Sequence, residues 1–117
     1  MPITTTPGHV MNARLKRRTD LTTQSFSYIA GKLAQSSHPL MLTSLYEQIL
    51  GEAEKHRGAL RLMQRDVFDA TNEGLRTKAL SDVRAQRIRD TAAKTIELAQ
   101  DAITRIASQY APQKMAA

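Results

Sequence analysis

The sequence predicts an all-α protein built on a long antiparallel helical hairpin, residues 39–72 and 78–110. A short N-terminal helix, about 22–35, and an irregular basic arm complete the prediction. Apolar residues recur at spacings of three and four over two long stretches, which is typical of amphipathic helices. No stretch alternates as a strand would, and the apolar residues are mainly Leu, Ile and Ala rather than aromatic.

Residues 1–19 contain Pro2, Pro7 and Gly8 with little periodicity, so we expect an irregular arm there. A helical face begins further on, formed by Phe26, Ile29, Ala30 and Leu33. The "SSHP" stretch ends this helix, because the residue before a proline is disfavoured in the α region.

The second predicted helix begins at Pro39, a favourable first helical residue. Gly74 is expected to end it near Asn72 as a left-handed C-cap. Its apolar face consists of Leu42, Leu45, Ile49, Ala53, His56, Leu60, Met63, Val67 and Ala70. A neighbouring apolar stripe consists of Tyr46, Leu50 and Phe68, about a quarter-turn away.

The third helix has the most regular pattern. Its apolar face repeats with near-heptad spacing, as in a coiled coil, at Ala85, Ile88, Ala92, Ile96, Ala99, Ile103 and Ile106. Thr77 or Ser81 can cap its start, and Pro112 marks its end. The three alanines would let a neighbouring helix approach closely.

We therefore expect an arm at 1–19, a single helical domain at 20–111 and a C-terminal tail at 112–117. A hairpin buries only one face of each helix, and a short third helix cannot cover the remainder. This favours a homo-oligomer, or a helical protein partner, over a slender monomeric three-helix bundle. The expected packing or partner interface combines the Tyr46, Leu50 and Phe68 stripe with the apolar face of the third helix.

The net charge of +6 is concentrated in two zones. Arg14, Lys16, Arg17 and Arg18 place four cations in five positions, and a second group follows at Arg76, Lys78, Arg84, Arg87 and Lys94. These nine residues are the candidates for contacting a polyanion, since Lys and Arg neutralise phosphate without reading sequence.

The residues give no support for catalysis, a metal or a cofactor. The chain has no Cys, and its His and Glu residues never take the Glu-x-x-His spacing of di-iron bundles. No phosphate-binding glycine loop is present, and no Ser or Thr is paired with a base and an acid. His56 lies on the apolar face of its helix, where a core role is expected.

We expect a non-enzymatic, cytoplasmic assembly or adaptor protein that self-associates or docks onto another helical protein, with the basic arm meeting an acidic partner. The alternative is an accessory nucleic-acid-binding protein that makes sequence-tolerant contacts to the phosphate backbone. A membrane partner is disfavoured. No segment approaches the roughly 20 apolar residues of a span, and Tyr46, Leu50 and Phe68, with Arg57 and Arg61 nearby, offer little area for insertion into an anionic lipid surface.

Overall fold

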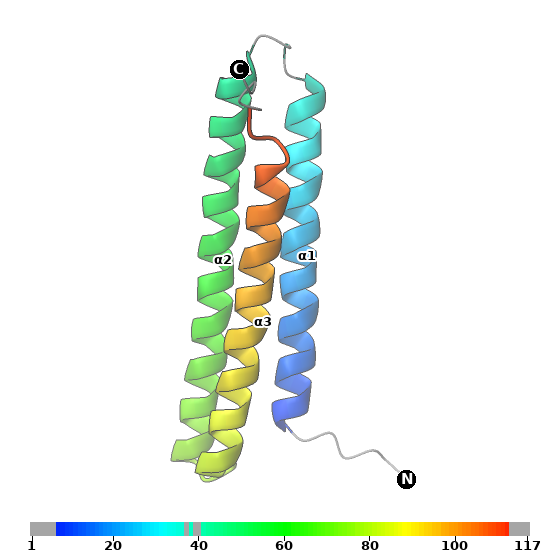
Figure 1. Cartoon of the computed structure of the whole chain (residues 1–117). Coiled ribbons are helices and arrows are strands. Elements are labelled where there is room, and N and C mark those ends of the chain that lie inside the picture. The colour runs from blue at the N-terminus through cyan, green and yellow to red at the C-terminus, as the bar shows by residue number, and fades with distance from the viewer. Residues whose placement is uncertain (1–6, 37, 39–40, 113–117) are drawn as a thin grey trace, which may run out of the picture.

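A computed structural model describes residues 7–36, 38 and 41–112, and almost all of them are helical (Figure 1). The helices are α1 (Pro7–Ser36), α2 (Leu42–Arg76) and α3 (Asp82–Ser108). No strand occurs among the described residues. The predicted all-α class is confirmed.

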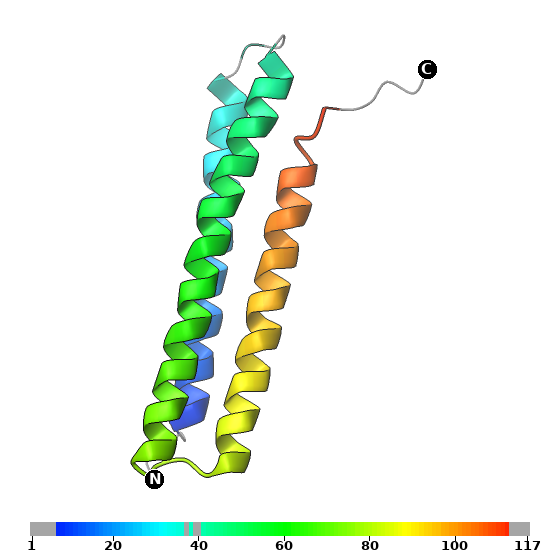
Figure 2. The ribbon, with the colours of Figure 1, turned by 90° about the vertical axis from the view of Figure 1, so that its left-hand side faces the viewer.

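The three helices lie side by side along one long axis (Figures 1 and 2). α1 and α3 run in the same direction and α2 runs opposite to both, so the α2–α3 connection lies at the end where α1 begins. Each helix packs against the other two. The first and last helices of the chain are therefore direct neighbours.

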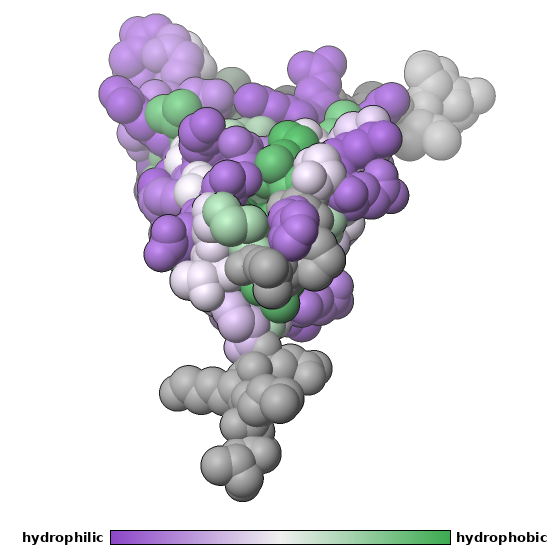
Figure 3. Space-filling model, turned by 90° about the horizontal axis from the view of Figure 1, so that it is seen from above, coloured by the Kyte–Doolittle hydropathy of each residue, from purple (hydrophilic) through white to green (hydrophobic). Residues whose placement is uncertain are grey.

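The core runs along the centre of the three helices. Seen along the axis from the end where α1 stops, polar side chains surround the molecule and apolar ones appear between them (Figure 3). The buried apolar residues are Leu15, Phe26 and Ala30 of α1, Leu45, Ile49, Ala53, Leu60, Met63 and Val67 of α2, Leu80 of the connection, and Ala85, Ile88, Ala92, Ile96, Ala99, Ile103 and Ala107 of α3.

The prediction of an irregular arm over residues 1–19 is wrong from Pro7 onward, because α1 begins there rather than near residue 22. Proline is tolerated in the first turn of a helix, where its missing N–H has no partner to lose. Leu15 and Thr19 are buried, and the Thr19 hydroxyl donates to the Lys16 carbonyl oxygen at 2.8 Å. A threonine that satisfies its own hydroxyl can occupy a core position, so the apolar pattern continues through a residue that looks polar.

The expectation of a partner helix assumes that a short first helix leaves apolar surface of the hairpin uncovered, and α1 is too long for that assumption to hold. With 30 residues, α1 lies along most of the hairpin instead of crossing it as a short helix. The predicted interface on α3 is consequently buried inside this single chain, at Ala85, Ile88, Ala92, Ile96, Ala99 and Ile103, with Ile106 partly buried against it.

The end of α2 also differs from the prediction. The helix continues past Asn72 to Arg76, and Lys78 rather than Gly74 takes the left-handed conformation, with φ 62°. Gly74 serves packing instead: a Cβ there would lie 2.5 Å from Cδ1 of Leu80. The predicted start of this helix at Pro39 lies outside the described residues.

α3 begins at one of the two predicted caps. The Ser81 side chain accepts from the Arg84 backbone N–H at 3.2 Å, which satisfies one of the unpaired donors of the first turn. This cap fixes the start of α3 at Asp82 and so sets the positions of the cations that follow.

Candidate functional site

Ion pairs are distributed unevenly over the three helices. In the part of the chain that the structure describes, all of them join residues of α1 or α2, and none within 4.0 Å involves α3. α3 nevertheless carries five cations, Arg84, Arg87, Arg89, Lys94 and Arg105. Four of them, all except Arg89, are exposed and lack a carboxylate partner.

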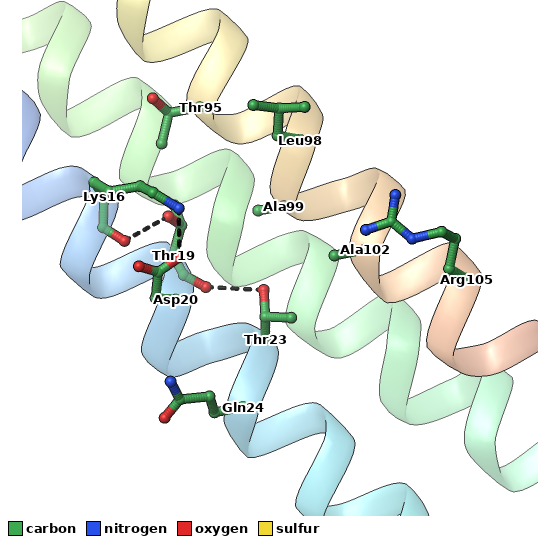
Figure 4. A pocket seen from close by; sticks show the side chains of 10 residues that line it. All are labelled: Lys16, Thr19, Asp20, Thr23, Gln24, Thr95, Leu98, Ala99, Ala102 and Arg105. Carbon is green, nitrogen blue, oxygen red and sulfur yellow. Dashed lines mark hydrogen bonds and ion pairs between the residues drawn. The ribbon is translucent and has the colours of Figure 1, made fainter.

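A groove lies between α1 and α3 (Figure 4). Its volume is about 440 Å³, and its α1 wall is polar while its α3 wall includes small and aliphatic side chains. The lining residues are Lys16, Thr19, Asp20, Thr23 and Gln24 from α1 and Thr95, Leu98, Ala99, Ala102 and Arg105 from α3. Lys16 and Asp20 form an ion pair on the α1 wall, with 2.8 Å between Nζ and Oδ1.

The cations of α3 continue one wall of this groove along the helix. Residues three or four apart share a helix face, and the positions 84, 87, 91, 95, 98, 102 and 105 follow that spacing. Because Thr95, Leu98, Ala102 and Arg105 line the groove, Arg84 and Arg87 lie on the same side of α3, about three and two turns before Thr95. Lys94 lies at the outer edge of this row, seven residues after Arg87.

α1 contributes two cations beside this row. Lys16 lines the groove directly. Arg17 lies on the outward side of α1, because it is two residues from both Leu15 and Thr19, which point into the core. We define the α1/α3 face by its six cations: Lys16, Arg17, Arg84, Arg87, Lys94 and Arg105.

Four acids lie near these six cations, and among the described residues only Asp20 forms an ion pair with one of them within 4.0 Å. Asp20 is the single carboxylate lining the groove, and it is paired with Lys16. The other three acids lie on the outer side of α3, next to the edge of the face that holds Lys94 and Arg105; they are Asp90, which accepts a 2.8 Å hydrogen bond from the Gln86 amide, Glu97 and Asp101. The α1/α3 face thus keeps an excess of positive charge, which attracts anions over about a Debye length.

The structure brings together five of the nine predicted cations and separates the others. Arg14 and Arg18 face α2, where they border a hollow of about 160 Å³ with Asp66, and Arg18 lies 3.9 Å from that carboxylate. Lys78 lies in the α2–α3 connection.

Arg76 is also engaged outside the α1/α3 face. Its guanidinium donates to both carboxylate oxygens of Glu73, with 2.9 Å between Nε and Oε2. This hydrogen bond lowers the pKa of Glu73 and raises the pKa of Arg76. Arg76 is therefore already satisfied by a neighbouring acid.

Sequence reasoning missed Arg105 as a member of this face. The spacing along α3 indicates that Arg105 belongs to the face, since residues 87, 94, 98 and 105 follow one another in helical steps of seven, four and seven. The distance from the other cations along the chain concealed it.

The predicted stripe of Tyr46, Leu50 and Phe68 does not form a continuous open surface. The Arg89 guanidinium lies 5.8 Å from the centre of the Phe68 ring, donates from Nε to the Thr71 hydroxyl at 3.1 Å and also bonds Asn72. Arg89 therefore joins α3 to α2 and covers Phe68. Leu50 stays exposed and Tyr46 is half-buried.

His56 takes part in packing. Its Nδ1 lies 2.7 Å from the Glu52 carbonyl oxygen, and its ring lies 5.4 Å from that of Phe26. Among residues 7–36, 38 and 41–112, no three His, Asp or Glu side chains gather in a way that could hold a metal. None of the helices described combines the length and apolar character needed to cross a bilayer.

Comparisons with protein-family models, with curated proteins and with solved structures found no match to this chain.

Proposed function

We propose that the protein is a non-enzymatic accessory nucleic-acid-binding protein that contacts the phosphate backbone through the α1/α3 face. The observation that supports this function is the exposed row on α3, Arg84, Arg87, Lys94 and Arg105, none of which has an ion-pair partner among the described residues. Unpaired cations on one face can neutralise successive phosphates and release their counterions.

The composition of the face favours contacts that tolerate any sequence. No aromatic ring lines the groove, and Gln24 is its one amide side chain. Base edges are read largely by paired hydrogen bonds from Arg, Asn or Gln in a groove of the duplex, and bases of single strands stack on rings. A face of exposed Lys and Arg side chains without rings in its groove is better suited to the backbone.

Docking onto another helical protein is the second candidate. It is favoured by a largely apolar hollow of about 550 Å³ at the end of the bundle opposite the α2–α3 connection, lined in part by Ala34, Leu42, Leu45 and Tyr110. Self-association through the apolar face of α3 is no longer favoured, because α1 and α2 already cover that face.

Two matched double variants test nucleic-acid binding. Lys16→Gln/Arg17→Gln removes two cations from the α1/α3 face, and Arg14→Gln/Arg18→Gln removes two from the same stretch of α1 on the side of α2. Each variant breaks one exposed ion pair and changes the net charge equally. Binding of labelled duplex DNA and RNA is measured by fluorescence anisotropy at two ionic strengths, with the mass in solution recorded.

The first variant is expected to weaken binding and to reduce the slope of log K against log salt by about 1 to 2, since each phosphate contact contributes about 0.9. The second is expected to bind almost as the unmodified protein does. Equal losses would show that total charge rather than the α1/α3 face determines binding. Absence of binding at low salt would refute the function, and growth in mass without nucleic acid would favour the adaptor role.

A further inference from the structure

Resting on the proposed function, we infer that the ligand is double-stranded and that the α1/α3 face covers about ten base pairs along one side of the duplex. Three features of the face support this inference: its length, the fixed spacing of its α3 cations and the absence of rings from the groove walls.

The length of the α3 row matches one turn of a duplex. From Arg84 to Arg105 the helix advances about 32 Å, at about 1.5 Å per residue. A B-form duplex advances about 3.4 Å per base pair along its axis. A straight row of this length therefore spans about nine or ten base pairs. All four of its cations belong to one helix, Asp82–Ser108, so their spacing is fixed by the backbone.

The pair of cations on α1 widens the face at one level of the bundle. Lys16 and Arg17 belong to α1, which packs beside α3 at the 8–10 Å separation usual for neighbouring helices. A single phosphate chain can follow the α3 row alone, whereas a duplex offers two chains held apart by its grooves, and the second chain can meet the cations of α1. A row of cations at fixed positions on α3, with two more cations beside it on α1, therefore suits a stiff ligand with two lines of charge.

Single strands gain little from this surface. Proteins that bind single strands combine a basic channel with rings on which the bases stack, and each stacked base contributes substantially to affinity. The walls of the α1/α3 groove instead present threonine hydroxyls and the aliphatic Leu98, Ala99 and Ala102. An unpaired base has no ring to stack on in this groove, and the exposed ring of Tyr28, three turns after Arg17 on α1, already has the Lys32 ammonium 5.6 Å from its centre.

The salt dependence follows from the number of cations. If five of the six cations contact phosphates, log K falls with log salt at a slope of about −4.5. Raising the salt from 50 to 200 mM would then weaken duplex binding by roughly 500-fold.

The test uses DNA hairpins with stems of 6, 10 and 16 base pairs and a common loop, together with an unstructured 16-nucleotide strand, all with the full-length protein. Affinity per site is expected to rise up to the stem of 10 and then to level off, and the single strand is expected to bind at least tenfold more weakly than the stem of 16. Equal or tighter binding of the single strand would overturn the inference and leave the proposed function standing. Failure of every probe to bind would instead refute the function itself.

Arg105→Gln tests the footprint from the far end of the row. This variant is expected to lose several-fold affinity for the stem of 10 but almost none for the stem of 6, which is too short to reach from Arg84 to Arg105. Lys55→Gln, which removes an exposed cation of α2 paired with Glu52, is the matched control and should leave both affinities unchanged. Equal losses on both stems with Arg105→Gln would contradict a ten-base-pair footprint.

Discussion

Replacing Leu15 with alanine tests whether the N-terminal third of α1 is a packed helix. Leu15 is 2% exposed and belongs to the core. Truncation removes three carbon atoms, worth about 2.4 kcal/mol of burial, and leaves a cavity that costs more where it cannot collapse. A hollow of about 160 Å³ already borders this side chain, so its neighbours have room to relax. We expect a loss of about 2.5 kcal/mol in the free energy of unfolding.

The assay is chemical denaturation followed by circular dichroism, combined with amide hydrogen exchange. Leu21→Ala is the matched control, because Leu21 lies in the same helix and is 56% exposed. The control is expected to change the free energy of unfolding by less than about 0.5 kcal/mol. Equal effects of the two variants, with fast exchange throughout residues 7–19, would refute the packing of this segment and remove Lys16 and Arg17 from the α1/α3 face.

Gly51→Ala is expected to raise the free energy of unfolding by about 0.5–1 kcal/mol, because a Cβ there meets nothing within 4 Å and alanine favours helix. A lower free energy of unfolding, measured by chemical denaturation, would contradict the open space around Gly51. Gly74→Ala is expected to lower it by about 1–2 kcal/mol in the same assay, because the new Cβ would lie 2.5 Å from Leu80, and a gain would contradict that packing. The hydrogen bond from Arg76 lowers the pKa of Glu73 in the folded protein. The Glu73 carboxylate therefore stabilises the fold fully at pH values above its unfolded pKa of about 4.3, and this contribution is lost as the pH falls through the lower folded pKa. Glu73→Gln should therefore flatten the acid side of a stability–pH profile, and an unchanged profile would count against the pair.

The sequence predicted the helical class and the core face of α3, because near-heptad spacing over many turns has no other simple explanation. It also identified Ser81 as a cap, from a side chain that competes well for the first N–H groups. It failed on residues 7–19, where Pro7, Gly8 and a buried Thr19 made a helix resemble a polar arm. Thr19 shows why. Its hydroxyl is hydrogen-bonded to the backbone carbonyl of Lys16 in the same helix, so burying it costs little free energy, and the sequence alone does not reveal that it is buried.

The candidate site could be predicted only in part, for a different reason. The sequence identified cations such as Arg84 and Arg87, but which of them share a surface depends on which helices are neighbours. Lys16 and Arg18 are two residues apart, and helical geometry directs one toward α3 and the other toward α2. Without the position of α1, those two side chains were indistinguishable.

The contact between α1 and α3 joins parts of the chain that lie far apart in order of synthesis. Lys16 of α1 and Arg105 of α3 line one groove, yet all of α2 lies between them in the chain. A chain without α3 has no second wall for the groove beside α1 and lacks the four-cation row. The α1/α3 face can therefore assemble only after α3 has been synthesised, whatever ligand it serves.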